Sequence, residues 1–132
     1  MNNIEAKEIL KLYRPGTAGS LAGREEEAAA LEARLGAEPL KVEDAPLARF
    51  LESEGRLVRV GDGYAISPTA YEQARTALVR ELETADRITL ARFRDLAGVG
   101  RRDAQLLLER LDQDGIIRRL GDGRVLRRAG RV

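Results

Sequence analysis

Several residue types on which enzymes and metalloproteins depend are missing from this chain of 132 residues. It contains no cysteine and no histidine. Disulfides, thiolate or imidazole zinc sites, and Ser/His or Cys/His catalytic pairs are therefore excluded. No apolar run approaches the roughly 18 residues of a membrane span, and the first residues lack the features of a signal peptide. We expect a cytoplasmic protein that is not an enzyme, needs no cofactor or metal, and has no membrane partner.

Aromatic residues are also scarce, with three tyrosines, two phenylalanines and no tryptophan. Only Phe93 falls in the C-terminal third, where its helical spacing predicts a buried position. Proteins that bind single-stranded nucleic acid usually stack the bases on exposed aromatic side chains. That mode of recognition is therefore disfavoured.

Charge is distributed unevenly along the chain, although the net charge is only +1. Residues 87–132 carry twelve arginines against six acidic residues, whereas residues 1–86 carry eleven basic and sixteen acidic residues. Arginine makes forked contacts with phosphate groups. The C-terminal third therefore favours a polyanionic partner, with a merely solvated cationic surface as the alternative.

One segment of the sequence occurs twice, sixty residues apart. Glu54–Gly63 (EGRLVRVGDG) returns as Asp114–Gly123 (DGIIRRLGDG), and two leucines precede each copy at the same spacing. Each copy predicts a helix ended by glycine and then two short strands, joined by a tight turn in which Asp-Gly takes positive φ values. A helix followed by a two-stranded wing is typical of the winged-helix fold.

The pattern therefore predicts an α+β, mostly helical protein with tandem winged-helix modules, of which the first is abbreviated. Residues 1–23 are expected to form an N-terminal helix and linker. Residues 24–67 form the abbreviated module, with helices over 24–35 and 47–54 and a loop over 37–46 in place of a helix. Residues 68–132 form the complete basic module.

The complete module shows several signals of helix starts and of a wing. Ser67 precedes Pro68, and a serine cap with proline at the first helical position begins a long helix that reaches about Ala85. Ile88 is expected to form a strand stub, and Thr89 to cap a short helix. A helix over 101–114 and strands over 116–120 and 124–128 complete the module.

Six arginines of this module are the candidate nucleic-acid contacts. In a helix-turn-helix module the second helix points its N-terminus at the nucleic acid, and here that helix begins with Arg101 and Arg102. The wing adds Arg118, Arg119, Arg124 and Arg127. Strand alternation sets Arg118 opposite to Arg119 and Arg124 opposite to Arg127. We expect the main contacts from Arg101, Arg102, Arg119 and Arg124.

Alternatives to these roles stay open at this point. Arg102 pairing with a nearby aspartate, or Arg118 solvating a sheet edge, is about as common for a single arginine as contact with a ligand. Gly121–Gly123 is a hairpin turn rather than a phosphate-binding loop, because no Lys-Ser/Thr follows it. We predict no catalytic residues.

The second module resembles a known family. The segments Thr89–Gly98 (TLARFRDLAG), Leu107–Asp112 (LLERLD) and Arg118–Asp122 (RRLGD) are similar to the last winged-helix domain of the bacterial selenocysteine-specific translation elongation factor, SelB. Glu54–Tyr71 resembles the join between the last two winged helices of that factor. The family usually has Ser-Arg-Lys-Tyr where this chain has Gly100–Asp103, so the basic pair is retained and the tyrosine is not.

The resemblance implies a function and partners. In that family the terminal domain binds a hairpin in the selenoprotein mRNA, the selenocysteine insertion element, while the GTPase domains deliver selenocysteinyl-tRNA. No P-loop is present here, so the chain is expected to bind an mRNA hairpin as a monomer, with the ribosome as a further partner, and not to hydrolyse GTP. The alternatives are a transcription regulator that binds duplex DNA and a module that binds protein.

Overall fold

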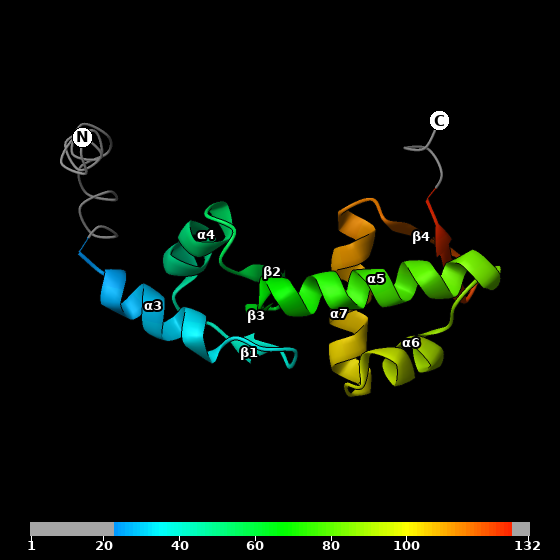
Figure 1. The fold of residues 1–132 in the computed structure, drawn as a ribbon, viewed down its shortest axis with the longest axis horizontal. Coiled ribbons are helices and arrows are strands. Elements are labelled where there is room, and N and C mark those ends of the chain that lie inside the picture. The colour runs from blue at the N-terminus through cyan, green and yellow to red at the C-terminus, as the bar shows by residue number, and fades with distance from the viewer. Residues whose placement is uncertain (1–22, 128–132) are drawn as a thin grey trace.

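The computed structural model describes residues 23–127, so the predicted N-terminal helix and most of its linker lie outside the described residues. The elements follow one another in two series (Figure 1). The first comprises α3 (Glu25–Arg34), β1 (Leu40–Lys41), α4 (Ala45–Ser53), β2 (Val58–Gly61) and β3 (Tyr64–Ile66). The second comprises α5 (Pro68–Thr84), α6 (Leu90–Ala97), α7 (Arg101–Gln113), β4 (Ile117–Leu120) and β5 (Gly123–Leu126).

The second series is a complete winged helix, and the first has the same order with one helix fewer. The strands of the first series form a three-stranded sheet in the order β1-β3-β2, and in the second series β4 pairs with β5. Figure 1 shows the two series side by side along the longest axis, with α5 crossing in front of α7. The predicted α+β tandem winged-helix architecture is confirmed.

Local signals at the helix ends are also confirmed. The Ser67 hydroxyl accepts a hydrogen bond of 3.0 Å from the Ala70 amide, and Pro68 occupies the first turn of α5. The Thr89 hydroxyl accepts one of 3.1 Å from the Arg92 amide. These side chains satisfy amides that have no partner within the helix, and they fix where α5 and α6 begin.

The loop expected over residues 37–46 is wrong at two places. Leu40 and Lys41 form β1, which pairs antiparallel with β3. Helix α4 begins at Ala45 rather than Leu47, because Asp44 accepts a hydrogen bond of 3.1 Å from the Leu47 amide. Pro46 lies in the first turn of this helix, where its missing N–H costs nothing.

The two Gly-Asp-Gly turns differ in register. In the first wing Asp62 and Gly63 both have positive φ values, of 55° and 80°, as expected. In the second wing Leu120 pairs with Gly123, so the two-residue loop is Gly121 and Asp122, and only Gly121 has a positive φ, of 64°. The expected Asp-Gly conformation is therefore correct for the first turn and wrong for the second.

Gly123 lies beside the strand stub at Ile88. Ile88 and Arg124 exchange two backbone hydrogen bonds of 2.9 Å, which confirms the stub. A Cβ atom at Gly123 would lie 3.1 Å from the Ile88 carbonyl oxygen. Gly123 therefore serves a close approach between strands, and the turn is made by the two residues before it.

The first wing packs into two hydrophobic cores at once. Leu57 and Ala65 lie in the core of the first series, together with side chains of α3 and α4. Val60 and Ile66 lie in the core of the second series, which contains the fully buried Phe93. Successive side chains of a strand point to opposite faces, so one hairpin serves both cores. The module boundary at residue 67 stays a prediction, since packing crosses it.

Candidate nucleic-acid interface

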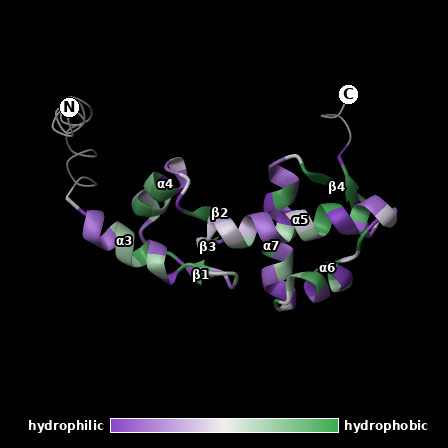
Figure 2. Ribbon diagram, in the orientation of Figure 1, coloured by the Kyte–Doolittle hydropathy of each residue, from purple (hydrophilic) through white to green (hydrophobic). Residues whose placement is uncertain are grey.

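Helix α7 buries side chains on two faces rather than one. Ala104, Leu107, Leu108 and Leu111 lie in the core of the second series, as the spacing predicts. Leu106 is also buried, with 5% of its surface exposed, and it lies against the first wing. A Cβ atom at Gly61 would lie 3.1 Å from the Leu106 Cδ2. Figure 2 shows hydrophilic and hydrophobic stretches alternating along α7, as expected of an amphipathic helix.

Positions four residues apart along α7 share this second face with Leu106. Arg102 precedes Leu106 by one turn, and Arg110 follows it by one turn; both contact residues of the first series. Residues at this spacing share one helix face. The helix that begins with the predicted nucleic-acid contacts is therefore also the helix that holds the two series together.

The start of α7 leaves both predicted arginines available. Gly100 is the N-cap and has no side chain to bond the first amides. Arg101 and Arg102 are exposed, and neither forms an ion pair with a carboxylate among residues 23–127. The aspartate partner considered for Arg102 is not found in that range. Instead, the Arg102 guanidinium carbon lies 4.5 Å from the centroid of the Tyr64 ring.

The wing arginines lie on two faces of the hairpin. Arg119 and Arg124 are opposite one another in the β4–β5 register, whereas Arg118 is opposite Val125. Arg119 is exposed, but Arg124 is only 8% exposed and its Nε has no hydrogen-bond partner among the described residues. As placed, Arg124 offers little surface to a ligand, so its role as a main contact stays a prediction.

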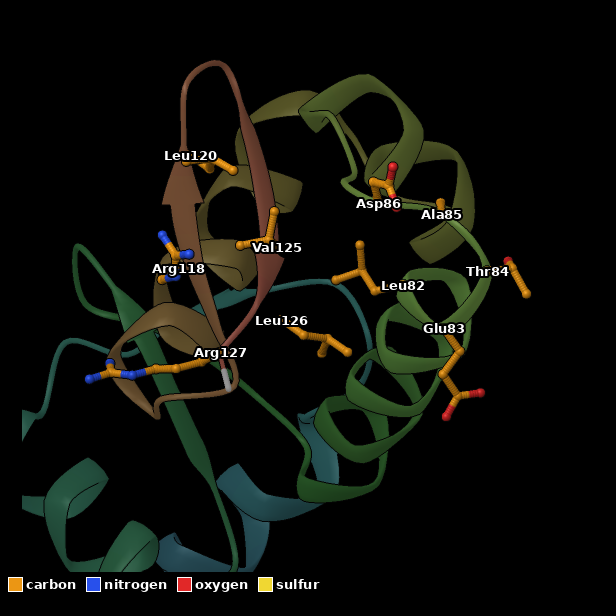
Figure 3. Close-up of a pocket in the computed structure, with 10 residues that line it drawn as sticks. All are labelled: Leu82, Glu83, Thr84, Ala85, Asp86, Arg118, Leu120, Val125, Leu126 and Arg127. Atoms are coloured by element: carbon orange, nitrogen blue, oxygen red, sulfur yellow. The ribbon is translucent and has the colours of Figure 1, made fainter. Parts of the chain in front are cut away.

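The other face of the wing lines a groove of about 820 Å³ beside the end of α5. Figure 3 shows Arg118 and Arg127 on its strand side and Glu83 and Asp86 on its helix side. Leu120 contributes to its apolar lining. The predicted arginines thus fall into three places, the start of α7 and the two faces of the wing.

The six predicted arginines differ from the other arginines of the second series in their ion pairing. The remaining arginines between residues 87 and 127 all pair with carboxylates: Arg87 with Asp122, Arg92 with Glu81, Arg94 with Asp95, and Arg110 with Glu52 and Asp114. The hydrogen bonds from Arg92 hold the pKa of Glu81 below its ordinary value. The six predicted arginines have no such partner within residues 23–127, so within that range their charges are not neutralised by carboxylates.

Arg110 has a role that the sequence did not reveal. Its Nη1 lies 2.6 Å from Glu52 Oε2 and donates to the Arg59 carbonyl oxygen, also at 2.6 Å. Its Nε donates to Asp114, which accepts a hydrogen bond from the Tyr71 hydroxyl as well. Because Arg59 and Glu52 lie 51 and 58 residues away, no local pattern identifies this contact.

Neither a membrane-spanning helix nor a cluster of metal-binding side chains is found among the described residues. None of the helices between residues 23 and 127 has the length and apolar character to cross a bilayer. Within the same range, no three acidic side chains gather where they would hold a metal ion.

Comparisons with known proteins give a consistent result. Residues 80–126 match the family model described as elongation factor SelB, winged helix. The fold is similar to that of the mRNA-binding domain of elongation factor SelB from E. coli, solved in complex with SECIS RNA, with a TM-score of 0.68 and 23% identity. That match covers 81% of this chain and 96% of the other.

A second structure shows the same arrangement. The bacterial selenocysteine-specific elongation factor EF-Sec matches with a TM-score of 0.65 and 18% identity, over 76% of this chain and 18% of that one. A comparison with curated protein sequences gave no match. In sequence over residues 80–126 and in fold over most of its length, the chain is therefore similar to the C-terminal winged-helix domains of elongation factor SelB.

Proposed function

We propose that this chain binds an mRNA hairpin, the selenocysteine insertion element, and acts in selenocysteine incorporation during translation. One observation carries the proposal. Arg101 and Arg102 are exposed at the start of α7 without a carboxylate partner in the described range, on a fold similar to that of a SelB domain solved with SECIS RNA.

The recognition relies on charge and shape. Each guanidinium group donates forked hydrogen bonds to phosphate oxygens, and each phosphate contact releases about one counterion. The A-form major groove is too narrow for side chains, so a hairpin is recognised through its backbone and its extruded loop bases. On the wing, Arg119 is exposed on one face and Arg118 and Arg127 on the other, so one of these two sets extends the contact beyond the helix start.

Binding, rather than catalysis, is the proposed activity. The matched SelB domain is described by its binding to mRNA, and the sequence printed here has no P-loop for GTP. We further propose that the chain works in the cytoplasm as a monomer and that the ribosome is an additional partner. The activity of a whole elongation factor would require the GTPase domains in the same or another chain.

A binding assay at two salt concentrations tests the proposal. The ligands are an RNA stem-loop and a duplex DNA of equal charge. Tighter binding to the RNA that persists at the higher salt concentration is expected. Preference for the DNA would favour a transcription regulator, and binding to neither would favour a module that recognises protein.

A further inference from the structure

A second cation approaches the same aromatic ring as Arg102. The Lys41 Nζ lies 5.2 Å from the centroid of the Tyr64 ring, and the Arg102 guanidinium carbon lies 4.5 Å from it. Lys41 belongs to β1, Tyr64 to β3 and Arg102 to α7. We call these three residues the Tyr64 cluster. It joins the acidic first series to the start of the helix in the basic one.

The position of Lys41 is fixed by the strands around it. Lys41 pairs with Tyr64 across β1 and β3, and its Nζ donates a hydrogen bond of 2.9 Å to the Asp62 carbonyl oxygen. A Cβ atom at Gly63 would lie 3.3 Å from the same Nζ. The side chain therefore crosses Gly63 toward the tip of the first wing.

The charge of Lys41 is not neutralised by these contacts. A carbonyl oxygen is an uncharged acceptor, and Lys41 forms no ion pair with a carboxylate among the described residues. The side chain is exposed. An ammonium group held in this way keeps donors available for an anion.

Tyr64 orients the arginine without cancelling its charge. The ring is half-buried and packs against the core of the second series. A guanidinium group stacked on an aromatic ring still has its N–H groups at the edge, where a phosphate can accept them. A carboxylate partner would have occupied those donors instead.

We propose that the Tyr64 cluster is a phosphate-binding site that extends the RNA surface from the start of α7 onto the first wing. The inference rests on the proposed function. Lys41 and Arg102 contact the RNA backbone, and Tyr64 is a positioning residue for Arg102. The first series is then a direct contributor to binding, although its sequence is acidic overall.

The test measures RNA stem-loop affinity as a function of salt concentration for four variants. Lys41→Ala removes the cation, Tyr64→Leu removes the ring, and Tyr64→Phe keeps the ring. Arg80→Ala is the matched control, because Arg80 is an exposed cation on α5 with no ion pair among the described residues. Arg80→Ala removes one positive charge, as Lys41→Ala does, but at a position away from the Tyr64 cluster.

Each variant has its own expected result. Lys41→Ala should weaken binding and lower the salt slope by about one charge, as expected for one lost phosphate contact. Tyr64→Leu should weaken binding about two- to fivefold, since an exposed cation–π contact has an energy of that order. Tyr64→Phe should bind like the wild type. The Arg102 Nε–H resonance should carry a ring-current shift that Tyr64→Leu removes and Tyr64→Phe keeps.

The outcomes separate this inference from the proposed function. If the wild type binds the stem-loop, but Lys41→Ala and Tyr64→Leu change affinity no more than Arg80→Ala does, the inference is overturned and the proposed function stands. If the wild type does not bind the stem-loop, both are overturned. Because Lys41 is exposed, Lys41→Ala decides the matter even if Tyr64→Leu fails to fold.

Discussion

Arg110 and Glu52 form an ion pair of 2.6 Å that joins α7 of the second series to α4 of the first. The same guanidinium group also donates to the Arg59 carbonyl oxygen of the first wing. Glu52 accepts hydrogen bonds from Arg59 as well, one of them at 2.6 Å. These contacts hold the first wing against α7, and thereby set where the Tyr64 cluster lies relative to Arg101.

Replacing Arg110 should destabilise the protein. Arg110→Met removes the charge that pairs with Glu52 and the donor to the Arg59 carbonyl oxygen. We expect the free energy of unfolding to fall by about 1–3 kcal/mol, the usual cost of leaving a part-buried charged group without its partner. Urea denaturation followed by circular dichroism measures the change.

The control for this substitution is Arg94→Met. The ion pair between Arg94 and Asp95 is long, at 4.0 Å, and both side chains are exposed. Loss of Arg94 should therefore change the free energy of unfolding by less than about 0.5 kcal/mol. A double-mutant cycle with Glu52→Gln should show coupling between Arg110 and Glu52. Equal effects of the two arginine substitutions would contradict the role given to Arg110.

The Glu52 carboxylate should make stability depend on pH. Its burial raises the pKa, but hydrogen bonds from Arg110 and Arg59 outweigh the burial, so the pKa lies below its ordinary value. A lowered pKa in the folded state stabilises the protein above the unfolded pKa, about 4.3 for glutamate, and this stabilisation is lost as the pH falls through the folded value. Thermal unfolding between pH 7 and acidic pH should therefore show a smaller decline in Glu52→Gln than in the wild type. Identical declines would rule out this contribution.

The basic start of α7 should account for a measurable part of RNA binding. Changing Arg101 and Arg102 together to alanine should weaken stem-loop binding and lower its salt slope by up to about two charges. The control, Arg75 and Arg80 changed together to alanine, makes the same change in net charge on α5. A filter-binding titration over a range of salt concentrations compares them. An unchanged affinity would remove the helix start from the binding surface.

The two wing turns should respond differently to the same substitution. Asp62 has a φ of 55°, a left-handed conformation that costs an alanine about 1 kcal/mol, whereas Asp122 is not in that region. Asp62→Ala should therefore destabilise the protein more than Asp122→Ala, by up to about 1 kcal/mol, because aspartate adopts this conformation at a lower cost than alanine. The ion pair of Asp122 with Arg87 is 3.5 Å long and exposed, so its loss should matter little. Chemical denaturation of both variants decides this, and equal losses would contradict the difference in register.

Much of the fold could be predicted because its signals are local. Ser67 and Thr89 begin helices with hydrogen bonds that span three residues. The strand stub at Ile88 and both hairpins were likewise expected from short segments. The predicted loop that ends at Pro46 was wrong, because proline is compatible with the first helical turn as well as with a loop.

The candidate site could be predicted only in part. The charge pattern indicated the basic module, and the positions at a helix start and on a wing indicated six arginines, which lack carboxylate partners in the described range. The sequence did not reveal that Arg124 is buried, because the exposure of a strand residue is decided by tertiary packing. Nor did it reveal Lys41, which lies 61 positions before Arg102 in the chain.

The sequence by itself determined the repeated helix-and-wing pattern, the positions of the helix caps and the arginine-rich character of the second module. These follow from side-chain periodicity and from bonds between near neighbours. Only the tertiary structure decided that Leu106 is buried, that Arg110 joins the two series, and that Tyr64 lies against Arg102. Each of these depends on α7 packing against a wing that lies far earlier in the chain, and no short-range pattern encodes which of two helix faces meets it.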